Sequence, residues 1–303
     1  MRVRALRTAA PGAVAMVAVA LCALLAACGT VTKSPAPTAG STAPAATGAP
    51  SESDGPAIVR AYFGLGSTAA NPVLAPVERP AGAATDLTAR AKGALDALMA
   101  GPSPAELAAS PAMFTSITAG TTASSVQISA AGVATVDVSP SFEETDELPA
   151  LRTSLAQVVF TLTQFPEVTG VQVTVKGAVL SQTDASGADL TRPATRADYA
   201  DTMGPLFVDN PVWGASLSSP FHLSGLADVF EAQFRFRLLD ADGRSLADGQ
   251  LTASCGTGCL GTYGVDVPFH VAKQATGHLQ VFDLSEADGS PQDVVDYPVT
   301  LLP

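Results

Sequence analysis

Apolar and polar residues follow three successive patterns along this 303-residue chain. Three arginines, Arg2, Arg4 and Arg7, precede an unbroken apolar run from Val14 to Leu25. Residues 29–56 are then almost wholly Thr, Ala, Pro, Gly and Ser, a composition that cannot bury a core. Beyond this stretch, apolar residues recur at the spacings of strands and helices. The pattern predicts a leader, a spacer and a folded region of about 245 residues, which is room for two domains.

Residues 57–180 alternate between strand and helix periodicity. Helical spacing begins at Leu87, after Thr85 or Asp86 as N-cap, and stops at Gly101-Pro102; it begins again at Leu148 and stops at Pro166. Gly93 has a low helix propensity, so its presence inside the first predicted helix indicates a close packing contact at this position. The predicted strands are 58–63, an extended piece at 73–77, a hairpin of 125–129 with 133–138, and 171–175. The order β-α-β-β-α-β predicts an α/β sandwich, a small sheet covered by two helices.

Residues 211–303 show strand periodicity only. Ala232, Phe234, Phe236 and Leu238 alternate with polar residues, and Gly-containing turns separate the later segments. About seven short strands in this length predict an immunoglobulin-like β-sandwich. The further strands are expected at 246–253, 265–271, 279–284 and 294–301. Residues 181–210 are predicted to be a connector that packs against the domains. The predicted fold class is α+β, with an α/β sandwich followed by an all-β C-terminal domain.

The leader ends in Leu25-Ala26-Ala27-Cys28, which resembles a bacterial lipoprotein box. The resemblance implies that residues 1–27 are a signal peptide, that the Cys28 thiol takes a diacylglycerol, and that the chain is cut before Cys28. Acyl chains of the palmitate type then supply the membrane affinity, and residues 28–56 become a disordered linker. An ordinary signal cut nearby, with Cys28 incidental, is the alternative.

Charge narrows the range of partners. Removal of the leader leaves thirteen basic and twenty-eight acidic residues, a formal charge of −15. This field repels nucleic acid and anionic lipid headgroups, so we expect no nucleic acid as partner. No stretch after the leader has some eighteen consecutive apolar residues, so no transmembrane helix is expected there.

Cysteine usage agrees with export. Cys22 leaves with the leader, and only Cys255 and Cys259 remain in the folded region. An isolated pair in an oxidising compartment predicts a disulfide, and the glycines of Cys255-Gly256-Thr257-Gly258-Cys259 allow the tight turn it needs. A metal site needs two further ligands, and a redox motif is more often Cys-x-x-Cys.

The first domain resembles the GerMN domain of sporulation and germination proteins. The matching stretches are 61–63, 76–80, 97–102, 132–138 and the run Val159-Phe160-Thr161-Leu162-Thr163-Gln164-Phe165-Pro166. The second domain resembles the immunoglobulin-like domain of bacterial spore germination, through 219–221, 224–225, 229–232, 281–283 and 288–289. GerMN-type domains are similar to ring-building modules of envelope complexes, and the resemblance implies no catalytic residues. Similar architectures occur as lipoproteins in high-GC Gram-positive bacteria.

Few residues point to chemistry, and no catalytic, cofactor or metal site is predicted. The histidines His222, His270 and His278 lie in or beside strands and are interpreted as surface residues, with a metal site as the alternative. The acidic run 143–147 is interpreted as the cap of the second helix rather than a cation site. Residues 240–243 have the first letters of a calcium loop but are interpreted as a hairpin turn. Trp213 and Phe221 are assigned to packing, with a ligand groove as the alternative.

These observations favour a non-catalytic binding or assembly module, anchored by Cys28 at the extracytoplasmic face of the cell membrane. Its expected partners are the lipid bilayer, envelope proteins or cell-wall material, and a second copy of itself. Two alternatives stay open: a small-ligand receptor with its pocket between the domains, and a cell-wall enzyme or its activator that uses carboxylates such as Asp137 and Glu144.

Overall fold

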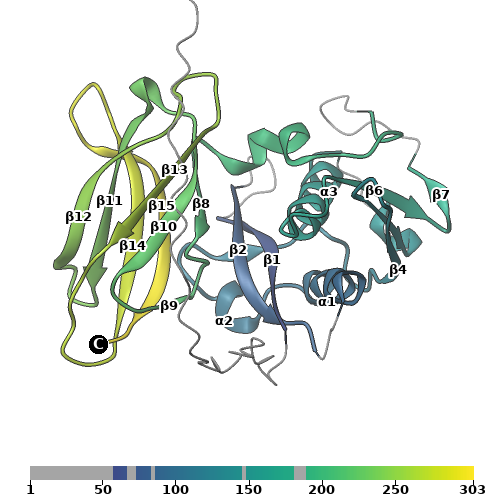
Figure 1. The fold of residues 1–303 in the computed structure, drawn as a ribbon, viewed down its shortest axis with the longest axis horizontal. Coiled ribbons are helices and arrows are strands. Elements are labelled where there is room, and N and C mark those ends of the chain that lie inside the picture. Colours follow the sequence, from purple (N-terminus) through teal and green to yellow (C-terminus); the bar gives the residue numbers. More distant parts are fainter. Residues whose placement is uncertain (1–56, 67–72, 83–85, 145–147, 181–188) are drawn as a thin grey trace, which may run out of the picture. The chain divides into compact units, whose positions relative to one another are not determined.

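The computed structural model describes residues 57–66, 73–82, 86–144, 148–180 and 189–303. The leader, Cys28 and the rest of the linker lie outside these residues. The described residues belong to one compact unit, in which an α+β domain precedes an all-β domain (Figure 1). The predicted fold class is therefore confirmed. None of the described helices has the length and apolar content that a membrane-spanning helix needs.

Two sheets form the strand layers of the first domain. The central strand β1 (Ile58–Leu65) pairs antiparallel with β2 (Val73–Pro80) and with the short β3 (Met113–Phe114). The second sheet has the order β4-β5-β6-β7, with β5 and β6 parallel. Its strands are β4 (Ala123–Ile128), β5 (Val133–Val138), β6 (Gly170–Val175) and β7 (Ala178–Val179).

The helices α1 (Leu87–Met99) and α3 (Leu148–Leu162) lie between these two sheets (Figure 1). We predicted one sheet, and the structure has two. The reason is the character of α3, whose buried side chains surround the helix and need cover on more than one side. Those residues are Leu151, Leu155, Ala156, Val158, Val159, Phe160 and Leu162. The short helix α2 (Pro104–Leu107) follows α1 and begins with a capping box between Ser103 and Glu106.

Local signals set the ends of α1. The Asp86 carboxylate accepts a hydrogen bond from the backbone N–H of Ala89 at 2.8 Å, which makes Asp86 the N-cap. Gly101 adopts a φ of 77° just after the helix, a left-handed conformation that favours glycine. A Cβ atom at Gly93 would lie 2.7 Å from the Cβ of Ala81, which follows β2. The close contact that we predicted at Gly93 is therefore present.

The second domain begins earlier than residue 211. A 3₁₀ segment (Arg196–Met203) buries Tyr199 and Met203, and β8 (Leu206–Asn210) then pairs antiparallel with β10 (Phe221–Ala227). The last part of the expected connector is thus a strand of the sandwich. Alternation did not reveal it because Leu206, Phe207 and Val208 are all buried.

Two sheets make up this sandwich. One has the order β13-β10-β8, and the other has the order β12-β11-β14-β15-β9. The remaining strands are β9 (Ser216–Leu217), β11 (Gln233–Asp240), β12 (Ser245–Thr252), β13 (Gly261–Val267), β14 (Ala275–Leu284) and β15 (Pro291–Leu301). The loop between β12 and β13 carries a disulfide between Cys255 and Cys259.

Replacement of Gly93 by alanine tests the contact between α1 and the end of β2. Helix propensity alone would stabilise the variant by up to about 1 kcal/mol. The added Cβ would collide with Ala81, so we expect the free energy of unfolding to fall by about 1–2 kcal/mol instead. Urea unfolding measures the change. Thr88→Ala, at an exposed position of the same helix, is the control and should lose nothing; a more stable Gly93→Ala would contradict the contact.

Candidate functional site

Polar side chains of α3, and of the turn that follows it, complete the hydrogen bonding of β1. The strand β3 pairs only with Gly64 and Leu65, which leaves the backbone of residues 60–62 open along that edge. The Gln164 amide donates to the carbonyl of Arg60 and accepts from its N–H, both at 2.7 Å. Thr161 accepts from the N–H of Tyr62 at 3.2 Å, and Gln157 donates to the carbonyl of Tyr62 at 3.0 Å. These buried polar groups are satisfied and fix α3 to β1.

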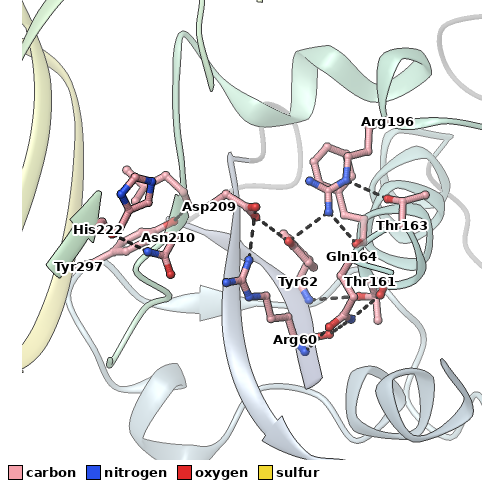
Figure 2. A network of polar contacts seen from close by, with 12 residues as sticks. Arg60, Tyr62, Thr161, Thr163, Gln164, Arg196, Asp209, Asn210, His222 and Tyr297 are labelled. Atoms are coloured by element: carbon pink, nitrogen blue, oxygen red, sulfur yellow. Dashed lines mark hydrogen bonds and ion pairs between the residues drawn. The ribbon is translucent and has the colours of Figure 1, made fainter. Parts of the chain in front are cut away.

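The Tyr62 hydroxyl joins the two domains (Figure 2). It donates a hydrogen bond to Oδ1 of Asp209, on β8, at 2.7 Å. The other oxygen of the Asp209 carboxylate lies 3.3 Å from the guanidinium of Arg60, two residues before Tyr62 on β1. A charged acceptor makes the Tyr62–Asp209 hydrogen bond stronger than a neutral one. Figure 2 shows Asp209 directed from the second domain towards Arg60 and Tyr62 of the first.

Arg196 supports the same hydroxyl from the opposite side. Its guanidinium donates to the Tyr62 hydroxyl and to the carbonyl of Phe160, each at 3.2 Å, and to the Thr163 hydroxyl at 2.8 Å. It also lies over the rings of Tyr62 and Phe160, 5.2 and 4.7 Å from their centroids. Phe207 of β8 completes the cluster, with its ring stacked on that of Tyr62 at 6.5 Å. We call these six residues the joint: Arg60, Tyr62, Phe160, Arg196, Phe207 and Asp209.

Burial keeps three tyrosines near the joint protonated. Burial raises the pKa of Tyr62 to about 12, and the negative charge of Asp209 adds to this effect while Arg196 opposes it. Burial also raises the pKa values of Tyr263 and Tyr297, whose hydroxyls donate to the carbonyls of Phe207 and Val208 at 3.1 Å. At neutral pH all three hydroxyls are therefore hydrogen-bond donors.

A cleft of about 540 Å³ lies beside the joint. Its walls come from β2 and α2 of the first domain, and from β8, the loop after it and the start of β10 in the second. Its volume falls within the range of about 300–1,000 Å³ that is common for small-ligand sites. The cleft is lined by residues 77–79, 106, 210–218, 221 and 222.

Trp213 and Phe221, which we assigned to packing with a ligand groove as the alternative, both line this cleft. Phe221 is buried and meets Phe269 edge to face, at 6.0 Å between ring centroids. Trp213 is half-buried, and its backbone N–H donates to the carbonyl of Pro76 at 2.9 Å. The Trp213 indole Nε1 is buried and has no hydrogen-bond partner among the described residues. The structure therefore gives both residues a packing role and a place at the cleft.

The histidines lie on the surface of the second domain. His222 and His278 are exposed, and their Nδ1 atoms lie 2.8 Å from carboxylate oxygens of Asp266 and Asp296. His270 is exposed as well. No group of three or more His, Cys, Asp or Glu side chains within the described ranges could hold a metal ion.

The carboxylates singled out in the sequence have structural partners where the structure describes them. Asp137 accepts hydrogen bonds from Ser124, Thr174 and the N–H of Gly177, and these donors, that of Gly177 first, lower its pKa. Asp240 holds the hairpin turn between β11 and β12 by accepting from the N–H groups of Asp242 and Arg244 at 2.9 Å. Glu143 and Glu144 are exposed, and residues 145–147 of the same acidic run lie outside the described residues.

Comparison with protein families identifies both domains. Residues 60–181 match the family described as "Sporulation and spore germination", and residues 206–290 match the "Immunoglobulin-like domain of bacterial spore germination". The chain is therefore built from one domain of each of these two families. It combines a GerMN domain with the immunoglobulin-like domain of bacterial spore germination, as the resemblance implied, and neither is a known enzyme family.

The solved structures that match this chain include two of the sporulation protein GerM from Bacillus subtilis. Its first GerMN domain is 21% identical, with a TM-score of 0.36, over 47% of this chain and 99% of that one. Its tandem GerMN domains are 15% identical, with a TM-score of 0.37, over 81% and 61%. A candidate lipoprotein from Clostridium perfringens is 17% identical, with a TM-score of 0.33, over 48% and 90%. No curated protein sequence matches the chain.

The polar residues that link α3 to β1, and Asp209 of the joint, were not predicted. Gln157 and Thr161 occupy positions that we counted as part of an apolar helix, and Asp209 was placed in the connector. One signal was available: the run Phe160-Thr161-Leu162-Thr163-Gln164 interleaves apolar and polar residues at the end of the second predicted helix. In the structure these residues have distinct roles, because Thr161 and Gln164 bond β1 while Thr163 bonds Arg196.

Alkaline pH tests the burial of the three tyrosines. Between pH 10 and 12 the folded protein keeps the Tyr62 proton, whereas the unfolded chain loses it near pH 10. The contribution of Tyr62 to the free energy of unfolding should therefore be constant below pH 10. It should fall by up to about 3 kcal/mol as the pH rises to 12. Urea unfolding and phenolate absorbance at 295 nm measure both effects. Tyr62→Phe should show a shallower decline, and titration of all four tyrosines near pH 10 in the folded protein would contradict the prediction.

Proposed function

We propose that the chain is a membrane-anchored extracytoplasmic lipoprotein whose two domains act as one non-catalytic binding or assembly module of the cell envelope. The joint carries this proposal. A charged hydrogen bond, an ion pair and stacked rings link β1 to β8, so a partner would meet the two domains as one surface rather than as two independent modules.

The sequence before residue 57 supports the anchor. Diacylglycerol on Cys28 would provide two acyl chains, at about 0.8 kcal/mol per buried CH₂, which is enough for stable attachment. The 28 residues of 29–56 would give roughly 30 Å of typical reach as a coil. A module on such a tether samples the envelope close to the membrane face. The match to germination domains also favours an envelope location.

The contacts of Asp137 weigh against the wall-enzyme alternative in the form that uses this residue. Three donors hold its carboxylate, and they lower its pKa and with it its strength as a base. A general base for wall hydrolysis would need the opposite shift of its pKa, towards neutral pH.

The alternative of a small-ligand receptor has a specific observation in its favour, which is the cleft lined by Trp213.

Fatty-acid labelling tests the anchor. Cells that express the full chain are grown with an alkyne-bearing palmitate, and the label on the protein and its membrane fraction are measured. We expect wild type to be labelled and membrane-bound, and Cys28→Ala to lose the label. Cys22→Ala is the matched control, because this cysteine leaves with the signal peptide and its loss should change nothing. Equal labelling of Cys28→Ala and wild type would overturn the anchor.

In-cell crosslinking with mass spectrometry tests the module. The proposal expects defined envelope proteins or wall fragments to be enriched with wild type and Cys22→Ala, and to be reduced with Cys28→Ala at equal abundance. No partner, no self-association and no retention on purified sacculi would together contradict it.

A further inference from the structure

The cleft between the domains has a polar pair built into its first wall. The guanidinium of Arg79 donates to Glu106 at 2.5 Å and to the carbonyl of Glu78 at 3.0 Å, and it lies over the ring of Phe63. The same Glu106 oxygen accepts from the N–H of Ser103 at 2.7 Å, because Glu106 belongs to the capping box of α2. The two side chains are only 21% and 7% exposed. Both are thus fixed in place without a ligand.

The second wall offers an indole and neutral polar groups. Trp213 stands on the loop that follows β8, where backbone bonds to Pro76 and from Gly214 to Pro298 hold the chain. Ser216, Ser218 and the amide of Asn210 lie along the same wall, and Asn210 donates to the carbonyl of His222 at 2.5 Å. An indole has a flat apolar face, and the residues of this wall also carry hydroxyl, amide and imidazole groups.

The balance of charge indicates a neutral ligand. The charged residues that line the cleft are Glu78, Arg79 and Glu106, and the arginine is already paired with Glu106. A formal charge near −1 gives no strong attraction for an anion or a cation, and the net charge of the chain repels anions. Paired donors and acceptors next to an aromatic face match a ligand that has many hydroxyl groups and an apolar ring face.

We infer that this cleft binds a short neutral saccharide, with one sugar ring against Trp213 and hydroxyl groups on Arg79 and Glu106. The inference rests on the proposed function, since it names the chemistry by which the module would contact glycan material of the envelope.

Trp213 is the only tryptophan of the chain, so its fluorescence reports on the cleft alone. Purified soluble protein from residue 29 onwards is titrated with the uncharged tetramer of N-acetylglucosamine. The cationic tetramer of glucosamine and the anionic tetramer of galacturonic acid are titrated in parallel. We expect a saturable change of emission with the neutral tetramer and at least about tenfold weaker binding of the charged ones. No saturable change with it, or tighter binding of a charged tetramer, would overturn the inference.

Variants locate the binding. Glu106→Gln keeps the size of the side chain but loses its charge, and Arg79→Lys keeps the charge but loses the planar guanidinium. Each variant should weaken binding of the neutral tetramer at least about tenfold. Arg244→Gln, in the exposed turn after β11, is the control and should bind as wild type does. Melting curves identify a variant that fails to fold, and the binding of the other cleft variant then tests the site.

Cleft variants that fold and bind the neutral tetramer with the affinity of wild type would overturn the site. Crosslinked protein partners without saccharide binding would leave the proposed function standing and refute only this inference.

Discussion

The hydrogen bond from the Tyr62 hydroxyl to Asp209 is the interaction on which the arrangement of this chain depends. It connects the central strand of the first domain to the first strand of the second. The hydroxyl is buried, so its partners must be supplied by the protein, and Arg196 and Asp209 supply them from segments more than 130 residues away in sequence. Because the Tyr62 hydroxyl would lose Asp209 as its acceptor if the domains separated, this contact stabilises the chain only when both domains are in place.

The position of the cleft follows from the same interaction. Tyr62 lies on β1, which pairs with β2, and the cleft residues Val77, Glu78 and Arg79 are part of β2. Asp209 precedes the segment 211–218, which includes β9 and forms most of the opposite wall. A contact that fixes β1 against β8 therefore also fixes the distance between the two walls. The contacts of the joint therefore set both the arrangement of the two domains and the shape of the cleft.

Local patterns in the sequence were sufficient to predict most elements. The N-cap is Asp86, one of the two predicted candidates, and the stop at Gly101 and the close contact at Gly93 appear as predicted, because each has a local signal in the sequence. The division of the first domain into two sheets was not predictable, since it depends on how an almost wholly apolar helix is covered. The contacts of Thr161 with β1 and of Asp209 in the joint were not predictable for a related reason, because both residues acquire their partners only from a strand distant in sequence.

A double-mutant cycle between Tyr62→Phe and Asp209→Asn tests this dependence most directly. Urea unfolding of wild type, both single variants and the double variant gives the coupling free energy, and Tyr62→Phe with the remote Asp240→Asn provides an additive control. We predict a coupling of about 1–3 kcal/mol for the first pair, with both domains unfolding in one transition. Additive effects, with separate transitions for the two domains in wild type, would contradict the account.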